Sequence, residues 1–226
     1  MNTKPASPVF KFMSEKNIPN PGPGRPKDPA KRAAILQAAQ HLFLHSGYEG
    51  TSMDAIATQA GVSKLTVYSH FTDKETLYAA AIRAVTEAQL PDLYHGEMAQ
   101  DHISATLERV GNAFCVLINS PESLALHRLL VGMAGQDVKL AELFYEVGPQ
   151  RVCDGMTQIL QQACARGELR VEQPQEAARQ FFTLLKGDSH FRLLIGYAEP
   201  MSEQQRREHV SSVVDTFLRL YAADTR

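Results

Sequence analysis

Residues 51–71 constrain the fold more than any other segment, because two short helical patterns follow each other across a tight turn. Thr51 or Ser52 can cap the first helix, and Gly61 supplies the left-handed residue that ends it. Ser63 can cap the second helix. Apolar residues recur at helical spacing in both patterns: Met53, Ile56, Ala57 and Ala60 in the first, and Val67 and Phe71 in the second. This arrangement predicts a helix-turn-helix, whose second helix would enter the DNA major groove.

Helical periodicity continues through the rest of the chain, and no alternating β pattern of useful length interrupts it. We expect a break near Gly148-Pro149, inside the helix that starts at about residue 137. The sequence therefore predicts an all-α protein of about nine helices, with an N-terminal three-helix domain and a C-terminal helical domain. The expected helices run over about 31–46, 53–60, 64–71, 73–89, 103–117, 121–133, 137–167, 175–196 and 203–222.

Charge and composition divide the chain into three parts. Residues 1–29 hold seven prolines, which predicts a flexible basic arm rather than a helix or a core. Residues 1–83 carry ten Lys and Arg against six Asp and Glu, whereas residues 84–226 carry thirteen against nineteen. A basic N-terminal part beside an acidic remainder suits a DNA-binding domain over 30–83 and a regulatory and dimerisation domain over 84–226.

Several classes of protein find no support in the sequence. No run approaches the roughly 18 apolar residues of a membrane span, and no apolar signal segment precedes Pro19, so we expect a cytoplasmic, nucleoid-associated bacterial protein. The three cysteines lie in apolar helical patterns, as small buried side chains or, alternatively, redox sensors. We expect no catalytic residues, cofactor or metal, because no nucleophile elbow or phosphate-binding loop is present, and Asp188 and His190 face apart on a helix.

The Gly61-Val62-Ser63 turn resembles that of the TetR family of bacterial transcriptional regulators, together with the residues Thr66, Tyr68, Phe71, Lys74, Glu75 and Leu77 that follow it. This resemblance covers roughly residues 25–83. The C-terminal part is similar to the AefR-like subgroup at Leu143–Arg151, Arg166–Leu169 and Leu185–Phe191. The resemblance implies a homodimer that binds operator DNA through its two N-terminal domains and senses a small molecule through its C-terminal domains.

The second helix of the motif carries the candidate DNA-reading residues. If Val67 and Phe71 point inward, Leu65 and Ser69 lie opposite them, where Leu65 can contact a thymine methyl group. Side chains on the flanks and at neighbouring helix starts suit phosphate oxygens: Thr51, Lys64, Thr66, Tyr68, His70 and Lys74. The resemblance supports all of these except Thr51, and Leu65 stands where the family often has glycine. Tyr68 and His70 could instead be ordinary half-buried surface residues, and the basic residues Arg25, Lys27, Lys31 and Arg32 could follow DNA or remain a solvated tail.

The body carries two further candidate sites. We expect a dimer interface on the last two helices, at Phe181, Leu184, Phe191, Val210, Val214, Phe217 and Tyr221, although the same stripes could form a monomer core. A largely apolar effector could contact Phe114, His127, Met133, Tyr145, Met156, Phe182 and Lys186, although a single apolar residue or histidine in such a pattern is more often part of an ordinary core. The expected function is a transcriptional repressor released from its operator by a small molecule. The alternatives are an activator of the same fold, an enzyme or a helical interaction module that does not bind DNA.

Overall fold

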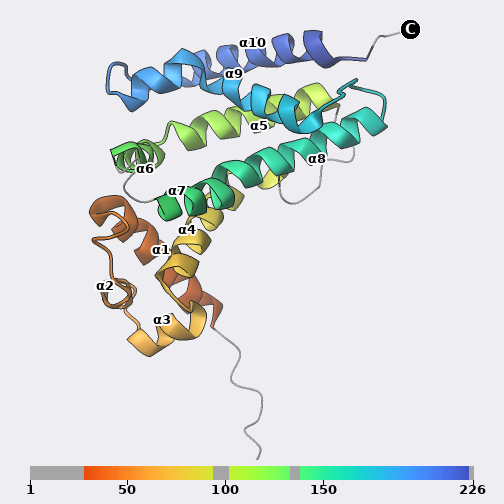
Figure 1. The fold of residues 1–226 in the computed structure, drawn as a ribbon. Coiled ribbons are helices and arrows are strands. Elements are labelled where there is room, and N and C mark those ends of the chain that lie inside the picture. The colour runs from red at the N-terminus through yellow and green to blue at the C-terminus, as the bar shows by residue number, and fades with distance from the viewer. Residues whose placement is uncertain (1–27, 94–101, 133–137, 224–226) are drawn as a thin grey trace, which may run out of the picture.

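The computed structural model describes residues 28–93, 102–132 and 138–223, in which helices are joined by turns and one isolated bridge pairs Leu169 with Ala222. The expected all-α fold is confirmed (Figure 1). The helices are α1 (Pro29–Ser46), α2 (Met53–Gln59), α3 (Lys64–His70), α4 (Lys74–Gln89), the 3₁₀ turn η1 (Pro91–Leu93), α5 (Ile103–Ile118), α6 (Pro121–Gly132), α7 (Val138–Tyr145), the π-helical turn η2 (Glu146–Gln150), α8 (Arg151–Ala165), α9 (Pro174–Leu194) and α10 (Glu203–Tyr221).

The break expected at Gly148-Pro149 is wrong. The chain instead passes from α7 into α8 through η2, so the three segments form one continuous helix and the described residues hold nine helical stretches. A π turn is wider than an α turn and accommodates a proline without ending the helix. Gly148 lies against α4, where an added Cβ would come within 3.4 Å of Ile82 Cγ2. The turn therefore lies at a close contact between this helix and α4.

Helices α1 to α4 build the head, which occupies the lower part of Figure 1. Their starts are set by side-chain caps: the carboxylate of Asp28, the hydroxyls of Ser52 and Ser63 and the carboxylate of Asp73 each accept a backbone N–H from the first turn. A buried cluster of apolar side chains then fixes how the four helices pack: Ile35, Leu36, Phe43, Met53, Ile56, Val67, Phe71, Leu77 and Tyr78.

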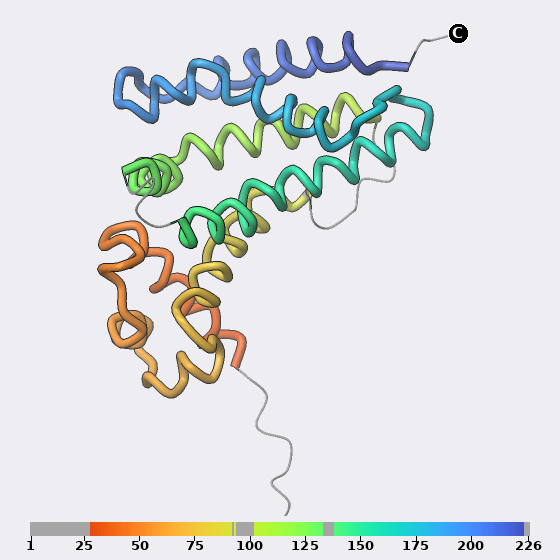
Figure 2. The backbone as a smooth tube through the Cα atoms, in the orientation of Figure 1, coloured from red at the N-terminus to blue at the C-terminus, as the bar shows by residue number. Residues whose placement is uncertain are grey.

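The remaining helices form the body. Figure 2 shows α9 and α10 side by side along its outer edge, with α5 beneath them and α8 nearer the head. Phe181 on α9 and Phe217 on α10 are fully buried, with their ring centroids 5.3 Å apart. The body core therefore lies between the last two helices and the α5–α8 layer.

Helix α4 connects the two parts. Its first turn carries Glu75, whose carboxylate lies 2.6 Å from the Lys139 ammonium on α7. Nearer its end, Glu87 accepts a 3.0 Å hydrogen bond from Arg151 at the start of α8. Leu140 on α7 belongs to the head's apolar cluster, so head and body meet through shared packing as well as ion pairs.

Candidate nucleic-acid interface and ligand cavity

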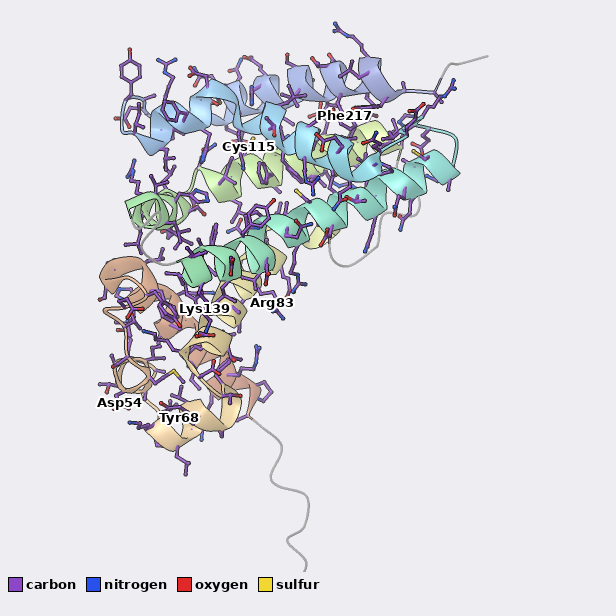
Figure 3. The ribbon with its side chains drawn as sticks, viewed as in Figure 1. Asp54, Tyr68, Arg83, Cys115, Lys139 and Phe217 are labelled. Atoms are coloured by element: carbon purple, nitrogen blue, oxygen red, sulfur yellow. The ribbon has the colours of Figure 1, made fainter. Side chains whose placement is uncertain are left out.

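Helix α3 presents the predicted DNA-reading face to solvent. Val67 and Phe71 are buried in the head, whereas Leu65 is 79% exposed and Tyr68 is 44% exposed. Ser69 is also exposed, and Figure 3 shows Tyr68 at the end of the head farthest from the body. An exposed leucine on an exposed helix is costly to hydrate, which suits a side chain that becomes covered when the helix binds a partner.

Local hydrogen bonds orient the polar side chains of α3. The Thr66 backbone N–H donates to Ser63 Oγ at 3.1 Å, and the two hydroxyls lie 2.8 Å apart. The Ser69 hydroxyl donates to the Thr66 carbonyl at 2.7 Å, so its oxygen remains available as an acceptor. Thr66 and His70 are both half-buried, which places them at the edges of the face rather than at its centre.

Lys64 is exposed but already paired. Its ammonium lies 2.9 Å from the Asp54 carboxylate on α2, and this hydrogen bond with its charge attraction raises the pKa of Lys64. Both side chains are more than half exposed, so the pair is weak and can exchange for another partner. A phosphate oxygen near the start of α3 would compete with Asp54 for the same ammonium.

Two predicted phosphate contacts also have structural uses. Thr51 is only 2% exposed, and its hydroxyl donates to the Gly47 carbonyl at 2.7 Å, so the side chain holds the α1–α2 turn, and a phosphate contact at the start of α2 stays a prediction. The Lys74 ammonium donates to the Tyr48 carbonyl at 3.0 Å and lies 4.1 Å from the centroid of the Tyr48 ring. Lys74 therefore ties the start of α4 to the same turn.

The predicted dimer interface divides into two sets. Phe181, Val210, Val214 and Phe217 are at most 2% exposed within a single chain, so the prediction that they contact a partner subunit is wrong. Their stripe faces α5 and α8, and helical periodicity alone does not tell which neighbour covers an apolar face. Exposed apolar side chains do remain on the same two helices: Leu184, Phe191 and Leu220, with Ile195 just after α9. Tyr221 is half-buried and donates its hydroxyl to the Gln180 side chain.

A cavity of about 180 Å³ lies where the head meets the body. Of the predicted effector contacts, Phe114, His127, Phe182 and Lys186 line it. Tyr145 is half exposed outside it and Met156 is buried in the body core, so these two predictions are wrong, and Met133 lies outside the described residues. The head supplies a wall that was not predicted from the sequence: Gln40, Phe43 and Leu44 from α1, and Tyr78, Ala81, Ile82, Val85 and Thr86 from α4. Those residues share the apolar stripes of the head core, so no separate signal distinguishes them.

The titratable side chains of the cavity include His127 on α6, Cys153 on α8 and Lys186 on α9. Burial lowers the pKa of His127 to about 4, aided by the positive charge of Lys186 and by His190, so its imidazole is neutral near pH 7. Burial raises the pKa of the Cys153 thiol, which therefore stays protonated. Cys115, outside this cavity, is buried as well, and burial raises its pKa to about 11. Neither environment favours the reactive thiolate of a redox sensor.

Neither a metal centre nor a membrane-spanning helix is evident in the described parts of the chain. No three His, Cys, Asp or Glu side chains there come together as ligands, and Asp188 instead pairs with Arg192 at 3.7 Å. Within the same residues, no helix has the length and hydrophobicity to cross a bilayer.

An exposed reading helix on a compact head, joined to a helical body with an internal cavity, defines a helix-turn-helix DNA-binding regulator. Residues 35–81 match the family model of the bacterial regulatory proteins of the tetR family. Residues 105–223 match the C-terminal domain of AefR-like transcriptional repressors. The chain belongs to the TetR family of bacterial transcriptional regulators, with an AefR-like C-terminal domain.

Individual relatives agree with this assignment. A putative TetR-family transcriptional regulator from Mesorhizobium loti is 28% identical, with a TM-score of 0.71 over 87% of this chain and all of the other. The flavonoid-responsive regulator FrrA is 32% identical, with a TM-score of 0.67 over 85% of this chain and 97% of FrrA. The HTH-type transcriptional regulator YdeS of Bacillus subtilis is 29% identical over 176 residues, which cover 76% of this chain and 82% of YdeS.

Proposed function

We propose that this regulator is a repressor that binds operator DNA as a homodimer and is released by a small, largely apolar molecule. The observation that carries the proposal is the position of the cavity, because α1 and α4 of the head form one wall and body helices form the other. A molecule that fills this space contacts both parts at once. It acts on DNA binding only if it binds the DNA-incompetent arrangement more tightly.

Residues 30–83 are proposed to read DNA through α3. Leu65, at the centre of the exposed face, would contact a thymine methyl group, with Ser69 beside it at the base edges. Tyr68, Thr66, His70 and Lys64 surround this pair and would bind phosphate oxygens, which fix the register of the head on the duplex.

Residues 84–226 are proposed to supply the regulatory and dimerisation functions. TetR-family regulators dimerise, and the exposed apolar side chains Leu184, Phe191, Ile195 and Leu220 support an interface on the outer face of α9 and α10. Two heads on one operator are needed because a single head of this size reads only a few base pairs.

The character of the effector follows from the walls of the cavity. Phenyl rings from Phe114 and Phe182 lie 4.5 Å apart, and most other lining side chains are aliphatic or aromatic. Such walls favour a flat, mostly apolar molecule. The name of FrrA describes that relative as flavonoid-responsive, which supports aromatic compounds as the first class to test here.

The DNA-binding part of the proposal is tested by the fragments of the source genome that the immobilised full chain retains. Sequencing the retained DNA should yield one inverted repeat, and Leu65→Ala should change the ranking among its variants. Arg170→Ala, at the exposed turn between α8 and α9, serves as the control and should leave the ranking unchanged. Retention without sequence preference would contradict the proposal.

Transcription in vitro from a template that carries the retained fragment separates repressor from activator. A repressor lowers the amount of transcript when the protein is added, and an effector restores it. More transcript on addition of the protein would assign the activator alternative.

A further inference from the structure

We propose that the effector is an organic acid, whose anionic group binds between the Lys186 ammonium and the His127 imidazole, and that its binding adds a proton to His127. This inference rests on the proposed function, because it assigns the chemistry of the molecule that fills the cavity. The body of the acid would lie against the apolar walls.

A ring nitrogen that has no hydrogen-bond partner in the described part of the chain, Nδ1 of His127, indicates where the anionic group would bind. His127 lines the cavity, and its buried Nδ1 has no hydrogen-bond partner among the described residues. The ring is held edge-on to Phe144 at 5.9 Å and to His190 at 5.6 Å between centroids. A buried polar atom without a partner costs about 1–3 kcal/mol, and an acceptor on the ligand would remove that cost.

Lys186 supplies a positive charge at the same place. It lines the cavity, and its charge acts on His127, His190 and Cys153, which come from three different helices. Among the residues that the structure describes, no side chain forms an ion pair with this ammonium. The His190 ring lies 5.6 Å from the His127 ring, and its Nδ1 is 2.8 Å from Asn119 Oδ1, so a second imidazole is fixed beside His127.

The groups around His127 leave this corner of the cavity basic. Helix α9 contributes Lys186 and His190, while α7 contributes the Phe144 ring. The acidic residue that lines the cavity is Glu122, in the exposed first turn of α6, five residues before His127. An anion at the corner therefore meets the Lys186 ammonium and the imidazole of His127, with the one lining carboxylate at the exposed start of the helix.

The remaining walls limit what the anion can be attached to. They are formed mainly by apolar side chains, and the Phe114 and Phe182 rings lie opposite the head helices. A sugar or a nucleotide would leave many polar groups unpaired against such walls. A hydrophobic carboxylic acid or an acidic phenol places one charged group at the basic corner and buries the rest.

Proton uptake follows from the state of the empty cavity. His127 is neutral there because burial and the neighbouring positive charges hold its pKa at about 4. A bound anion beside the ring reverses the sign of the local potential and raises that pKa. A group whose pKa rises on binding takes up a proton, so the acid should bind more tightly as the pH falls from 7.5 to 5.5, provided that the acid itself stays ionised.

Matched acids and amides test the charge requirement directly. Isothermal titration of the full chain with 2-naphthoate and 2-naphthamide, 4-phenylbenzoate and its amide, and dodecanoate and its amide compares molecules of nearly equal shape. We expect at least one acid to bind roughly tenfold or more tightly than its amide at pH 7, as for one hydrogen bond to a charged group. Titrations in buffers of different ionisation enthalpy should report uptake of part of a proton at pH 6.

Three variants assign the effect to residues. Lys186→Met should reduce the affinity for the acid to that of the amide and leave the amide unchanged. His127→Gln should reduce proton uptake to the smaller part that His190 can supply, while the preference for the acid is partly retained. Arg170→Met removes a cation at the far end of the body and should alter none of these quantities. Circular dichroism of each variant checks that it is folded.

Each outcome discriminates. Equal binding of acid and amide, or an acid affinity that Lys186→Met leaves unchanged, overturns the inference and leaves the proposed effector cavity intact. Acid binding without proton uptake overturns the role of His127. If no member of any pair binds, the proposed effector cavity is itself overturned, while the DNA-binding assignment stands on its own test.

Discussion

Asp54 pairs with Lys64, the lysine at the start of α3 that we propose contacts DNA. Its carboxylate lies 2.9 Å from the Lys64 ammonium, and it would also repel a phosphate at that position. Asp54→Asn should therefore strengthen DNA binding several-fold at low salt, and increase the magnitude of the salt slope by up to about 0.9, the contribution of one phosphate contact. Fluorescence anisotropy with an operator duplex at several salt concentrations measures both. In a Lys64→Met background only the smaller gain from the lost repulsion should remain; an undiminished gain there would mean that Lys64 is not the residue released.

His127 should make the body sensitive to acid. In the unfolded chain its pKa is near 6.5, and in the folded chain burial lowers it to about 4. Between these values the unfolded state binds more protons, so the free energy of unfolding decreases as the pH falls from about 6.5 to 4. The loss is at most about 3 kcal/mol, at 1.36 kcal/mol per pKa unit. Urea unfolding across this range measures it.

A His127→Phe variant is the control for this loss, because it fills the same space without a titrating group. Its stability should fall less steeply with decreasing pH. Some dependence should remain, since burial also lowers the pKa of His190. An identical pH profile for the two proteins would show that His127 does not contribute.

At the scale of helices, the sequence predicts where a helix begins better than which other helices it packs against. The caps Ser52 and Ser63 act within one turn of the chain, so they could be read directly, and α2 and α3 begin where they indicate. The π turn at Pro149 could not, because it depends on the packing of that segment against α4. For the same reason the sequence predicts that α10 has an apolar stripe without indicating that it faces the core of its own chain.

The proposed dimer interface is best tested at an exposed residue of α9, and not at a residue of the apolar stripe that is buried within the chain. Phe191 is 57% exposed, so Phe191→Asp should leave the chain folded and place an unpaired charge in the proposed interface. Analytical ultracentrifugation should then report a monomer, and operator affinity should fall. Phe217→Asp buries the charge in the body core instead and should unfold the protein. A folded Phe191→Asp dimer would mean that the interface lies elsewhere.

For the molecule as a whole, the contacts along α4 offer a route by which an effector in the cavity could change DNA binding by the head. The head wall of the cavity includes the middle of α4, and the same helix joins the body through Glu75–Lys139 and Glu87–Arg151. The four predicted effector contacts that do line the cavity all belong to the body: Phe114, His127, Phe182 and Lys186. The head wall of the cavity could not be predicted, because it exists only once α1 and α4 have packed against α6 and α8.

Fixing α4 to the body should therefore uncouple the two sites. Cysteines introduced by Glu75→Cys and Lys139→Cys, in a chain with alanine at positions 115, 153 and 164, can be joined by a short bifunctional maleimide. We expect the cross-linked protein to bind its operator normally but to remain bound when the tightest of the tested acids is added. Without the cross-link, the acid should weaken operator affinity roughly 5–150-fold, the range for a coupling free energy of about 1–3 kcal/mol. Anisotropy of a labelled operator measures both states, and the single-cysteine chains treated with the same reagent are the controls. Release of DNA by the cross-linked protein, at the acid concentration that releases the controls, would show that the coupling does not pass through the junction of α4 with α7.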